Sequence, residues 1–230
     1  MDDRIEKLAE YLEKRYIQKK LLNLFLGALI TLLCVFALIY MENIDREGIL
    51  ILRWMTVDGT LFTLILTVFF FAVNIIELRK NTELTRRAVY FARLSSAVAE
   101  AVIIIVVLQS QLTDSPMHVF RPDMFCMHII IPLLVIASFT MNDSPLGKLK
   151  KREILYGTSF VTFYAVIILT LIGSGVIRGE YIPYSFLDIR SMSLSSFAAI
   201  AALFYVMGYA LSALLSVLNR KVYWGWYRKK

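Results

Sequence analysis

Six stretches of apolar residues alternate with short polar connectors along this chain. They cover residues 21–41, 51–76, 89–111, 124–141, 153–174 and 195–218. Several of them approach or exceed the ~20 apolar residues that a helix needs to cross a bilayer. The pattern therefore predicts an all-α, polytopic membrane protein built as a six-transmembrane-helix bundle.

Composition and the short connectors leave almost no chain for a soluble domain. Of the 230 residues, 58% are hydrophobic, whereas soluble domains average about 45–50% apolar residues. We expect a cytoplasmic amphipathic segment over 1–20, a transmembrane domain over 21–219 and a basic cytoplasmic tail over 220–230. The first segment has apolar residues at helical spacing, which fits either a helix lying on the membrane face or a solvated helical extension.

Basic residues predict the orientation in the membrane. The termini and the connectors on one side hold 19 of the 25 Lys and Arg residues, the other side holds five, and Arg93 lies at the inner end of the third stretch. Because cytoplasmic loops carry the excess of basic residues, both termini are expected in the cytoplasm. The same bias accounts for the formal net charge of +7. We therefore expect the bilayer as a partner and no nucleic acid.

The second stretch carries a stripe of polar residues. Thr56, Thr60, Thr63 and Thr67 follow helical spacing, and Asn74 falls on the same face. We expect this face to point into the bundle. Threonines in membrane helices often bond to their own backbone or join helices, and this packing role is the simpler account of the three deeper threonines. Thr56 differs in lying near the outer end.

The fourth stretch carries His128, which is the only histidine within an apolar segment because His118 falls in a connector. Pro132 cannot donate a backbone hydrogen bond to the His128 carbonyl, so the helix should bend beside the imidazole. With helices that begin near residues 52 and 124, Thr56 and His128 both lie ~6 Å below the outer face. A hydroxyl and an imidazole at one depth are the minimum parts of a nucleophile and its base, although a buried histidine can also be purely structural.

Two carboxylates lie inside the apolar stretches, away from their first and last residues. Glu100 is near the middle of the third stretch, ~15 Å below the level of Thr56. A carboxylate at this depth indicates either a functional group or a structural bond to the threonine stripe. Asp58 lies ~200° around the helix from Thr56, so it should point away from the stripe and reach Arg53 or water at the outer interface.

The outer connector over 179–188 is aromatic and rich in turn-forming residues. Such a segment fits either an interfacial aromatic belt or a cap over a site that faces lipid. Tyr184, Phe186 and Asp188 are the candidate residues of this cap.

At these positions the chain resembles the androgen-induced integral-membrane protein family and its bacterial relatives, over roughly residues 50–220. The resemblance rests on residues 53–57 (Arg-Trp-Met-Thr-Val), on His128 with Pro132, and on residues 183–188 (Pro-Tyr-Ser-Phe-Leu-Asp). It implies a hydrolase of fatty acid esters of hydroxy fatty acids in a bacterial cell membrane. The family's threonine nucleophile falls on Thr56 and its essential histidine on His128.

The resemblance leaves the substrate open. Ile182 and Ser185 depart from the aromatic residue and the proline that the bacterial outer-loop motif has at these positions. Backbone amides near Gly59, or the Tyr184 hydroxyl, are the candidates for stabilising the oxyanion of an ester hydrolysis. The residues that we expect to bind a lipid substrate are Asp58, Thr60, Glu100, Pro132, Tyr184, Phe186 and Asp188.

Three other readings remain open. A transporter or lipid carrier would use the polar stripe as a pathway, with Glu100 as a proton or ion site. A haem electron carrier needs facing axial ligands, and one intramembrane histidine cannot supply a bis-histidine haem within one chain. Cys34 and Cys126 have neither metal-ligand spacing nor a disulfide framework, so we expect no cofactor and no metal. A purely structural membrane protein is the third reading.

Overall fold

The computed structural model describes residues 2–80, 87–114, 119–142, 145 and 148–227, and every regular element in these ranges is helical. Six helical segments are long and apolar enough to cross a membrane, and they coincide with the six predicted stretches. The prediction of an all-α bundle with six candidate spans is therefore confirmed. Arg86, His118 and residues 228–230 of the predicted tail lie outside the described residues.

The six spans contain several shorter helical pieces. The fourth span is divided into α5, η2 and α6, and the fifth into α7, η3 and α8. The elements are α1 (Asp2–Asp45), η1 (Gly48–Arg53), α2 (Met55–Lys80), α3 (Arg87–Asp114), α5 (Pro122–Phe125), η2 (Cys126–Ile130), α6 (Ile131–Asn142), α7 (Lys151–Ile154), η3 (Leu155–Thr158), α8 (Ser159–Ser174), η4 (Gly179–Tyr181), η5 (Ser185–Leu187) and α9 (Leu194–Tyr227).

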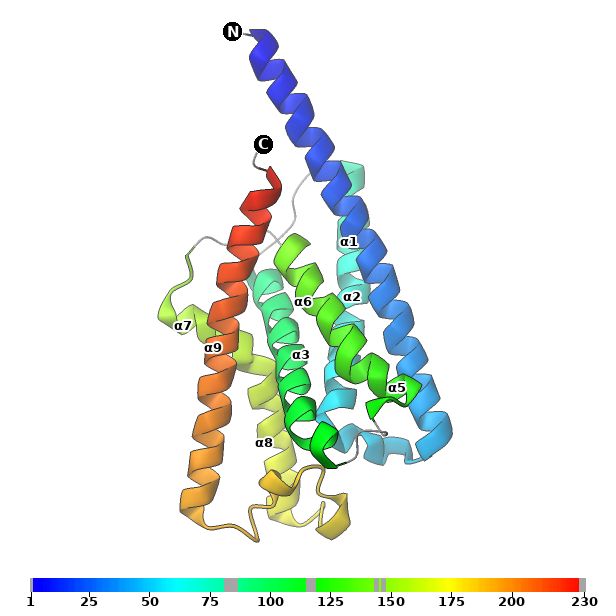
Figure 1. The fold of residues 1–230 in the computed structure, drawn as a ribbon, viewed down its shortest axis with the longest axis vertical. Coiled ribbons are helices and arrows are strands. Elements are labelled where there is room, and N and C mark those ends of the chain that lie inside the picture. The colour runs from blue at the N-terminus through cyan, green and yellow to red at the C-terminus, as the bar shows by residue number, and fades with distance from the viewer. Residues whose placement is uncertain (1, 81–86, 115–118, 143–144, 146–147, 228–230) are drawn as a thin grey trace.

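Helix α3 forms the centre of the bundle, with α2, α6, α8 and α9 packed around it (Figure 1). Its middle turns are buried on nearly all sides, which is typical of a helix without a polar face. Small side chains at Ala97, Ala99 and Ala101 allow this close packing. On α2, Gly59 has the same effect, because a Cβ there would lie 2.8 Å from the Ile103 side chain. Gly59 therefore serves the contact between α2 and α3.

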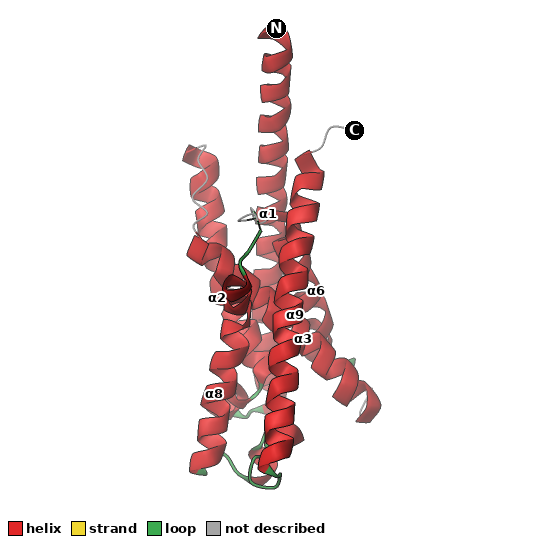
Figure 2. Cartoon of the chain, turned by 90° about the vertical axis from the view of Figure 1, so that its left-hand side faces the viewer, coloured by secondary structure: helices red, strands yellow, loops and turns green. Residues whose placement is uncertain are grey.

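Both termini lie at one end of the bundle, and α1 projects beyond the other helices there (Figure 1). Figure 2 shows that most of the loops gather at the opposite end, which we call the outer face after the charge bias. Helix α1 runs without a break from residue 2 into the first span. The described part of residues 1–20 is therefore helical and continuous with the first span. Its base is held by a buried ion pair between Lys20 and Glu77, and by the Lys19 ammonium 3.3 Å from the centre of the Tyr223 ring.

Candidate functional site

Thr56 and His128 meet at the outer end of the bundle. The Thr56 Oγ1 atom lies 3.2 Å from the His128 Nε2 atom, although the two residues are 72 positions apart in the chain. Both side chains are buried, with exposed fractions of 7% and 2%. The prediction that they lie within hydrogen-bonding reach of each other is confirmed.

A break in the backbone positions Thr56. The sequence predicted a helix already under way at residue 52, but η1 ends at Arg53, Trp54 is extended (φ −86°, ψ 123°) and α2 begins only at Met55. Thr56 is therefore the second residue of α2 and not one turn inside it. The first amide groups of a helix have no acceptor within that helix, so the amides of Met55 and Thr56 point out of its end. The expected depth of ~6 Å below the helix start is wrong for this residue.

Tyr164 holds this break in place, although no pattern in the sequence singled it out. Its hydroxyl donates a hydrogen bond of 2.6 Å to the backbone carbonyl of Arg53. Without this bond the Arg53 carbonyl would lack the amide partner of a continuous helix, because helical geometry is interrupted at Trp54. The one available signal was that Tyr164 lies near the middle of the fifth predicted span.

A π-helical turn positions His128. Residues Cys126–Ile130 form η2, in which the amide of Ile131 bonds to the Cys126 carbonyl, one residue further back than in an α-helix. Pro132 lies directly after this turn and lacks the amide that would bond to His128. The distortion predicted beside the imidazole is thus present as a π turn, a feature common at functional sites.

The outer connector brings Tyr184 against Thr56. Its hydroxyl is within hydrogen-bonding reach of the Thr56 side chain and of the backbone of Met55 and Thr56. Burial raises the pKa of Tyr184 to about 12, while these hydrogen bonds oppose the shift. The hydroxyl therefore stays protonated and able to donate at neutral pH.

A series of aromatic contacts continues from Tyr184 to α9. The Trp54 ring meets the Tyr184 ring edge-on at 5.7 Å, Tyr184 stacks on Phe186 at 5.2 Å, and Phe186 stacks on Phe204 at 5.1 Å. These contacts fix the connector over the beginning of α2. The connector therefore covers Thr56, as the cap interpretation of the sequence required.

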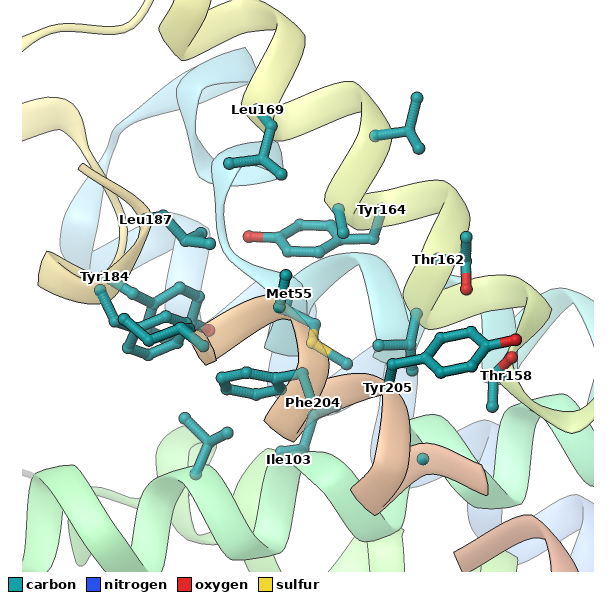
Figure 3. Close-up of a pocket in the computed structure, with 18 of the residues that line it drawn as sticks. Met55, Ile103, Thr158, Thr162, Tyr164, Leu169, Tyr184, Leu187, Phe204 and Tyr205 are labelled. Carbon is teal, nitrogen blue, oxygen red and sulfur yellow. The ribbon is translucent and has the colours of Figure 1, made fainter. Parts of the chain in front are cut away.

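Two cavities meet at Thr56. The first, of about 220 Å³, lies between α3, α8 and α9 and is almost wholly apolar (Figure 3). In Figure 3, Tyr184 and Leu187 lie at one end of it, and Thr158, Thr162 and Tyr205 at the other. Thr56 contributes to its wall beside Met55. We call this space the apolar cavity.

The second cavity, of about 210 Å³, is also lined by Thr56, and nearly half of its lining is polar. We call it the polar cavity. Asp45 and Glu47 contribute carboxylates to it, and His128 lines it together with Thr56. Its complete lining is Met41, Asp45, Glu47, Trp54, Thr56, Val57, Met124, Met127 and His128.

Ion pairs brace the polar cavity. Arg121 donates two hydrogen bonds of 2.8 Å to Asp45 and bonds of 2.8 and 2.7 Å to Asp123. Arg53 pairs with Glu47 at 2.8 Å. From the sequence, Asp58 was expected to reach Arg53 or water, whereas in the structure Arg53 binds Glu47. The Arg121 bonds tie the end of α1 to the start of α5, which leads into the turn that carries His128. The Arg53–Glu47 pair spans η1, which leads into the helix that carries Thr56.

Other predicted residues of the polar stripe form hydrogen bonds inside the bundle. Thr60 donates a bond of 2.8 Å to the Thr56 carbonyl. Thr63 donates to Glu100 at 2.7 Å and lies 2.9 Å from the Ser96 hydroxyl. Glu100 is fully buried, and its bond to Thr63 places it ~10 Å along α2 from Thr56. This distance is shorter than the ~15 Å inferred from the third stretch alone.

The predicted substrate-binding residues divide into two groups. Tyr184 and Phe186 line the apolar cavity. Asp188 accepts a bond from the Arg190 amide within the connector. The residues that line neither of the two cavities are Asp58, Thr60, Glu100, Pro132 and Asp188.

Within the described residues no group of three or more His, Cys, Asp and Glu side chains could hold a metal ion. Cys34 and Cys126 are both free thiols. No protein-family model, curated protein or solved structure matches this chain. The geometry around Thr56 is therefore the basis for inferring a function.

Proposed function

We propose that the chain is an intramembrane hydrolase of lipid esters, with Thr56 as the nucleophile and His128 as the general base. The observation that carries this proposal is the buried contact of 3.2 Å between Thr56 Oγ1 and His128 Nε2 at the junction of two cavities. Fatty acid esters of hydroxy fatty acids are the proposed substrates, on the strength of the resemblance to the androgen-induced integral-membrane protein family.

The first half of the reaction forms an acyl-enzyme. Thr56 Oγ1 attacks the ester carbonyl carbon while His128 Nε2 takes the hydroxyl proton, which requires the neutral ring to carry its proton on Nδ1. The C–O bond to the alcohol then breaks, and His128 returns the proton to the departing oxygen. The alcohol leaves, and the acyl group stays on Thr56.

The second half consumes one water. His128 removes a proton from the water as its oxygen attacks the acyl carbon, and the bond to Thr56 Oγ1 breaks. The threonine oxygen recovers the proton from His128, and the fatty acid leaves. The polar cavity supports this step, because it places His128 and Thr56 beside space that is lined by carboxylates and suited to water.

The start of α2 supplies donors for the negative oxygen that forms in both halves. The amides of Met55 and Thr56 are at a helix N-terminus, where the backbone carries partial positive charge. Both amides and the Thr56 side chain lie within hydrogen-bonding reach of the Tyr184 hydroxyl, so these donors gather beside Thr56. Preorganised donors of this kind are commonly the largest single contribution to acyl-transfer catalysis. Gly59, the other candidate from the sequence, lies deeper in α2 and packs on α3.

The test is covalent labelling by a fluorophosphonate, followed by hydrolysis of a lipid-ester panel in detergent. Thr56→Ala should abolish labelling, and His128→Ala should lower its rate by ~10²–10⁴-fold, the usual contribution of a general base. Thr170→Ala is the matched control, because Thr170 is exposed on α8 and bonds only to its own helix through the Val166 carbonyl. Undiminished labelling of folded Thr56→Ala protein would remove Thr56 as the nucleophile.

One observation favours a second candidate, a carrier that uses the polar interior. The Glu100 Oε2 atom is buried without a hydrogen-bond partner. A buried ionisable group of this kind is a candidate proton or ion site. A carrier predicts flux across vesicles that is lost in Glu100→Gln and kept in Thr56→Ala, which is the reverse of the pattern that the hydrolase predicts for ester cleavage.

A further inference from the structure

The apolar cavity has the length of one lipid tail. Its wall on α9 runs from Phe197 to Gly208, and its wall on η3 and α8 runs from Thr158 to Leu169. Each wall covers eleven helical steps, or ~16 Å. Half of the ~30 Å hydrocarbon core of a bilayer is about the same length.

The cavity also lies where a lipid tail can reach it. Val166 on α8 and Tyr205 on α9 line it, and their side chains are 59% and 51% exposed. Both residues belong to helices that are long and apolar enough to cross a membrane. In a bilayer, the rims of the cavity on α8 and α9 would contact lipid, while Thr56 lies in its inner wall.

The end of the cavity remote from Tyr184 is closed by a close helix contact. A Cβ at Gly157 would lie 2.2 Å from the Ser212 hydroxyl, and this hydroxyl donates a bond of 2.6 Å to the Ile154 carbonyl. Helix α9 thus packs directly on η3 one turn beyond Gly208. A chain that enters beside Thr56 cannot continue past this point.

Gly208 leaves the last part of the cavity open. A Cβ at Gly208 would lie 3.2 Å from Thr158 Cγ2, which is tighter than ordinary contact. Both residues line the cavity at its closed end. A larger side chain at position 208 would therefore fill the space there without reaching Thr56.

We propose that the apolar cavity binds one acyl chain of a lipid ester drawn laterally from the outer leaflet, and that Gly208 and Thr158 set the longest chain that fits. The ester carbonyl lies at Thr56, the chain extends between α8 and α9, and its methyl end lies at Gly208. The polar part of the lipid then faces the polar cavity. The position of the carbonyl rests on the proposed function, whereas binding of the chain does not.

The first experiment measures hydrolysis of a series of esters that differ only in acyl length, with purified full-length protein in detergent. Gly208→Leu should lower turnover of long-chain esters and leave short-chain esters within about two-fold. Each excluded methylene is worth about four-fold in binding, so loss of room for two should cost about fifteen-fold. Gly225→Leu is the matched control, because Gly225 is on the same helix and a Cβ there meets no atom within 4 Å.

Equal losses for short and long esters in folded Gly208→Leu protein would overturn the assignment of chain length to Gly208. The same holds if long-chain turnover is unchanged. Gly208→Ala provides a graded second variant, since it adds one carbon and should shift the length preference by less than leucine does.

The second experiment detects the chain without any chemistry. A long fatty acid with a photoreactive group at its methyl end is crosslinked to Thr56→Ala protein, and the labelled peptides are mapped. Crosslinks should concentrate at Thr158–Thr162 and Tyr205–Gly208 and be reduced by an excess of unlabelled fatty acid and by Gly208→Leu. Labels spread over the lipid-facing surfaces of all spans would show bulk lipid and overturn the proposal. Crosslinks at the cavity end without any ester hydrolysis by wild type would sink the proposed function and leave the acyl site standing.

Discussion

Tyr184→Phe removes one hydroxyl from the site and keeps the ring. That hydroxyl is the group within reach of the Thr56 side chain and the first amides of α2. The ring retains its edge contact with Trp54 at 5.7 Å and its stack on Phe186 at 5.2 Å. The substitution therefore separates the donor from the aromatic cap that carries it.

The expected loss follows from the number of donors that remain. Removal of one donor to an oxyanion costs about 10²–10³ in kcat, or about 2.7–4 kcal/mol. The amides of Met55 and Thr56 stay in place, so we expect a loss near the lower end, about 10²-fold. A net hydrogen bond contributes about 1 kcal/mol to folding, so the protein should remain folded. Because the cavity wall is unchanged, KM should stay within roughly three-fold.

The assay is steady-state hydrolysis of a short-chain ester in detergent, which gives kcat and KM separately, with thermal unfolding of the same samples. Tyr181→Phe is the control, because Tyr181 belongs to the same connector, is 48% exposed and lines neither cavity. A Tyr184→Phe enzyme whose kcat matches that of Tyr181→Phe would refute a role for the hydroxyl in stabilising the oxyanion.

Two further predictions concern pH and packing. The unfolded chain loses the Tyr184 proton near the ordinary tyrosine pKa of about 10, whereas the folded chain keeps it until about 12. Stability should therefore fall as pH rises through this window, and thermal unfolding of Tyr184→Phe should show a shallower fall; identical slopes would contradict the assignment. At the other end of the bundle, Glu77→Ala leaves the buried Lys20 ammonium without its ion pair, which should cost about 3–5 kcal/mol of unfolding free energy. The double variant Lys20→Met with Glu77→Leu should recover most of that loss in the same unfolding assay, and a double variant as unstable as Glu77→Ala would show that charge is not the cause.

Local features of the chain predicted much of the site. His128 and Pro132 are four residues apart, so the loss of a backbone bond at the imidazole could be inferred from spacing alone. The form of the distortion, a π turn over Cys126–Ile130, required the structure. The threonine stripe was also visible in the sequence, and two of its deeper members bond within the bundle: Thr60 to the Thr56 carbonyl and Thr63 to Glu100. The Thr67 hydroxyl is buried without a hydrogen-bond partner.

The start of α2 illustrates what spacing could not show. Ile51 and Leu52 are as apolar as the helix that follows, and nothing local marks a break at Trp54. The break is stabilised by Tyr164 on α8, whose hydroxyl donates a hydrogen bond to the Arg53 carbonyl. The position of the first amides of α2 is therefore set by a tertiary contact and not by the local sequence.

The sequence by itself determined the six spans and the charge bias, because transfer of an apolar side chain into lipid and the distribution of basic residues are properties of short segments. It also determined which side chains could act, Thr56 and His128. Tertiary structure decided that these two touch, that Tyr184 covers them, and that an apolar and a polar cavity meet at one hydroxyl. Those outcomes depend on which helices pack together, and packing energy is shared among many weak contacts between residues far apart in the chain.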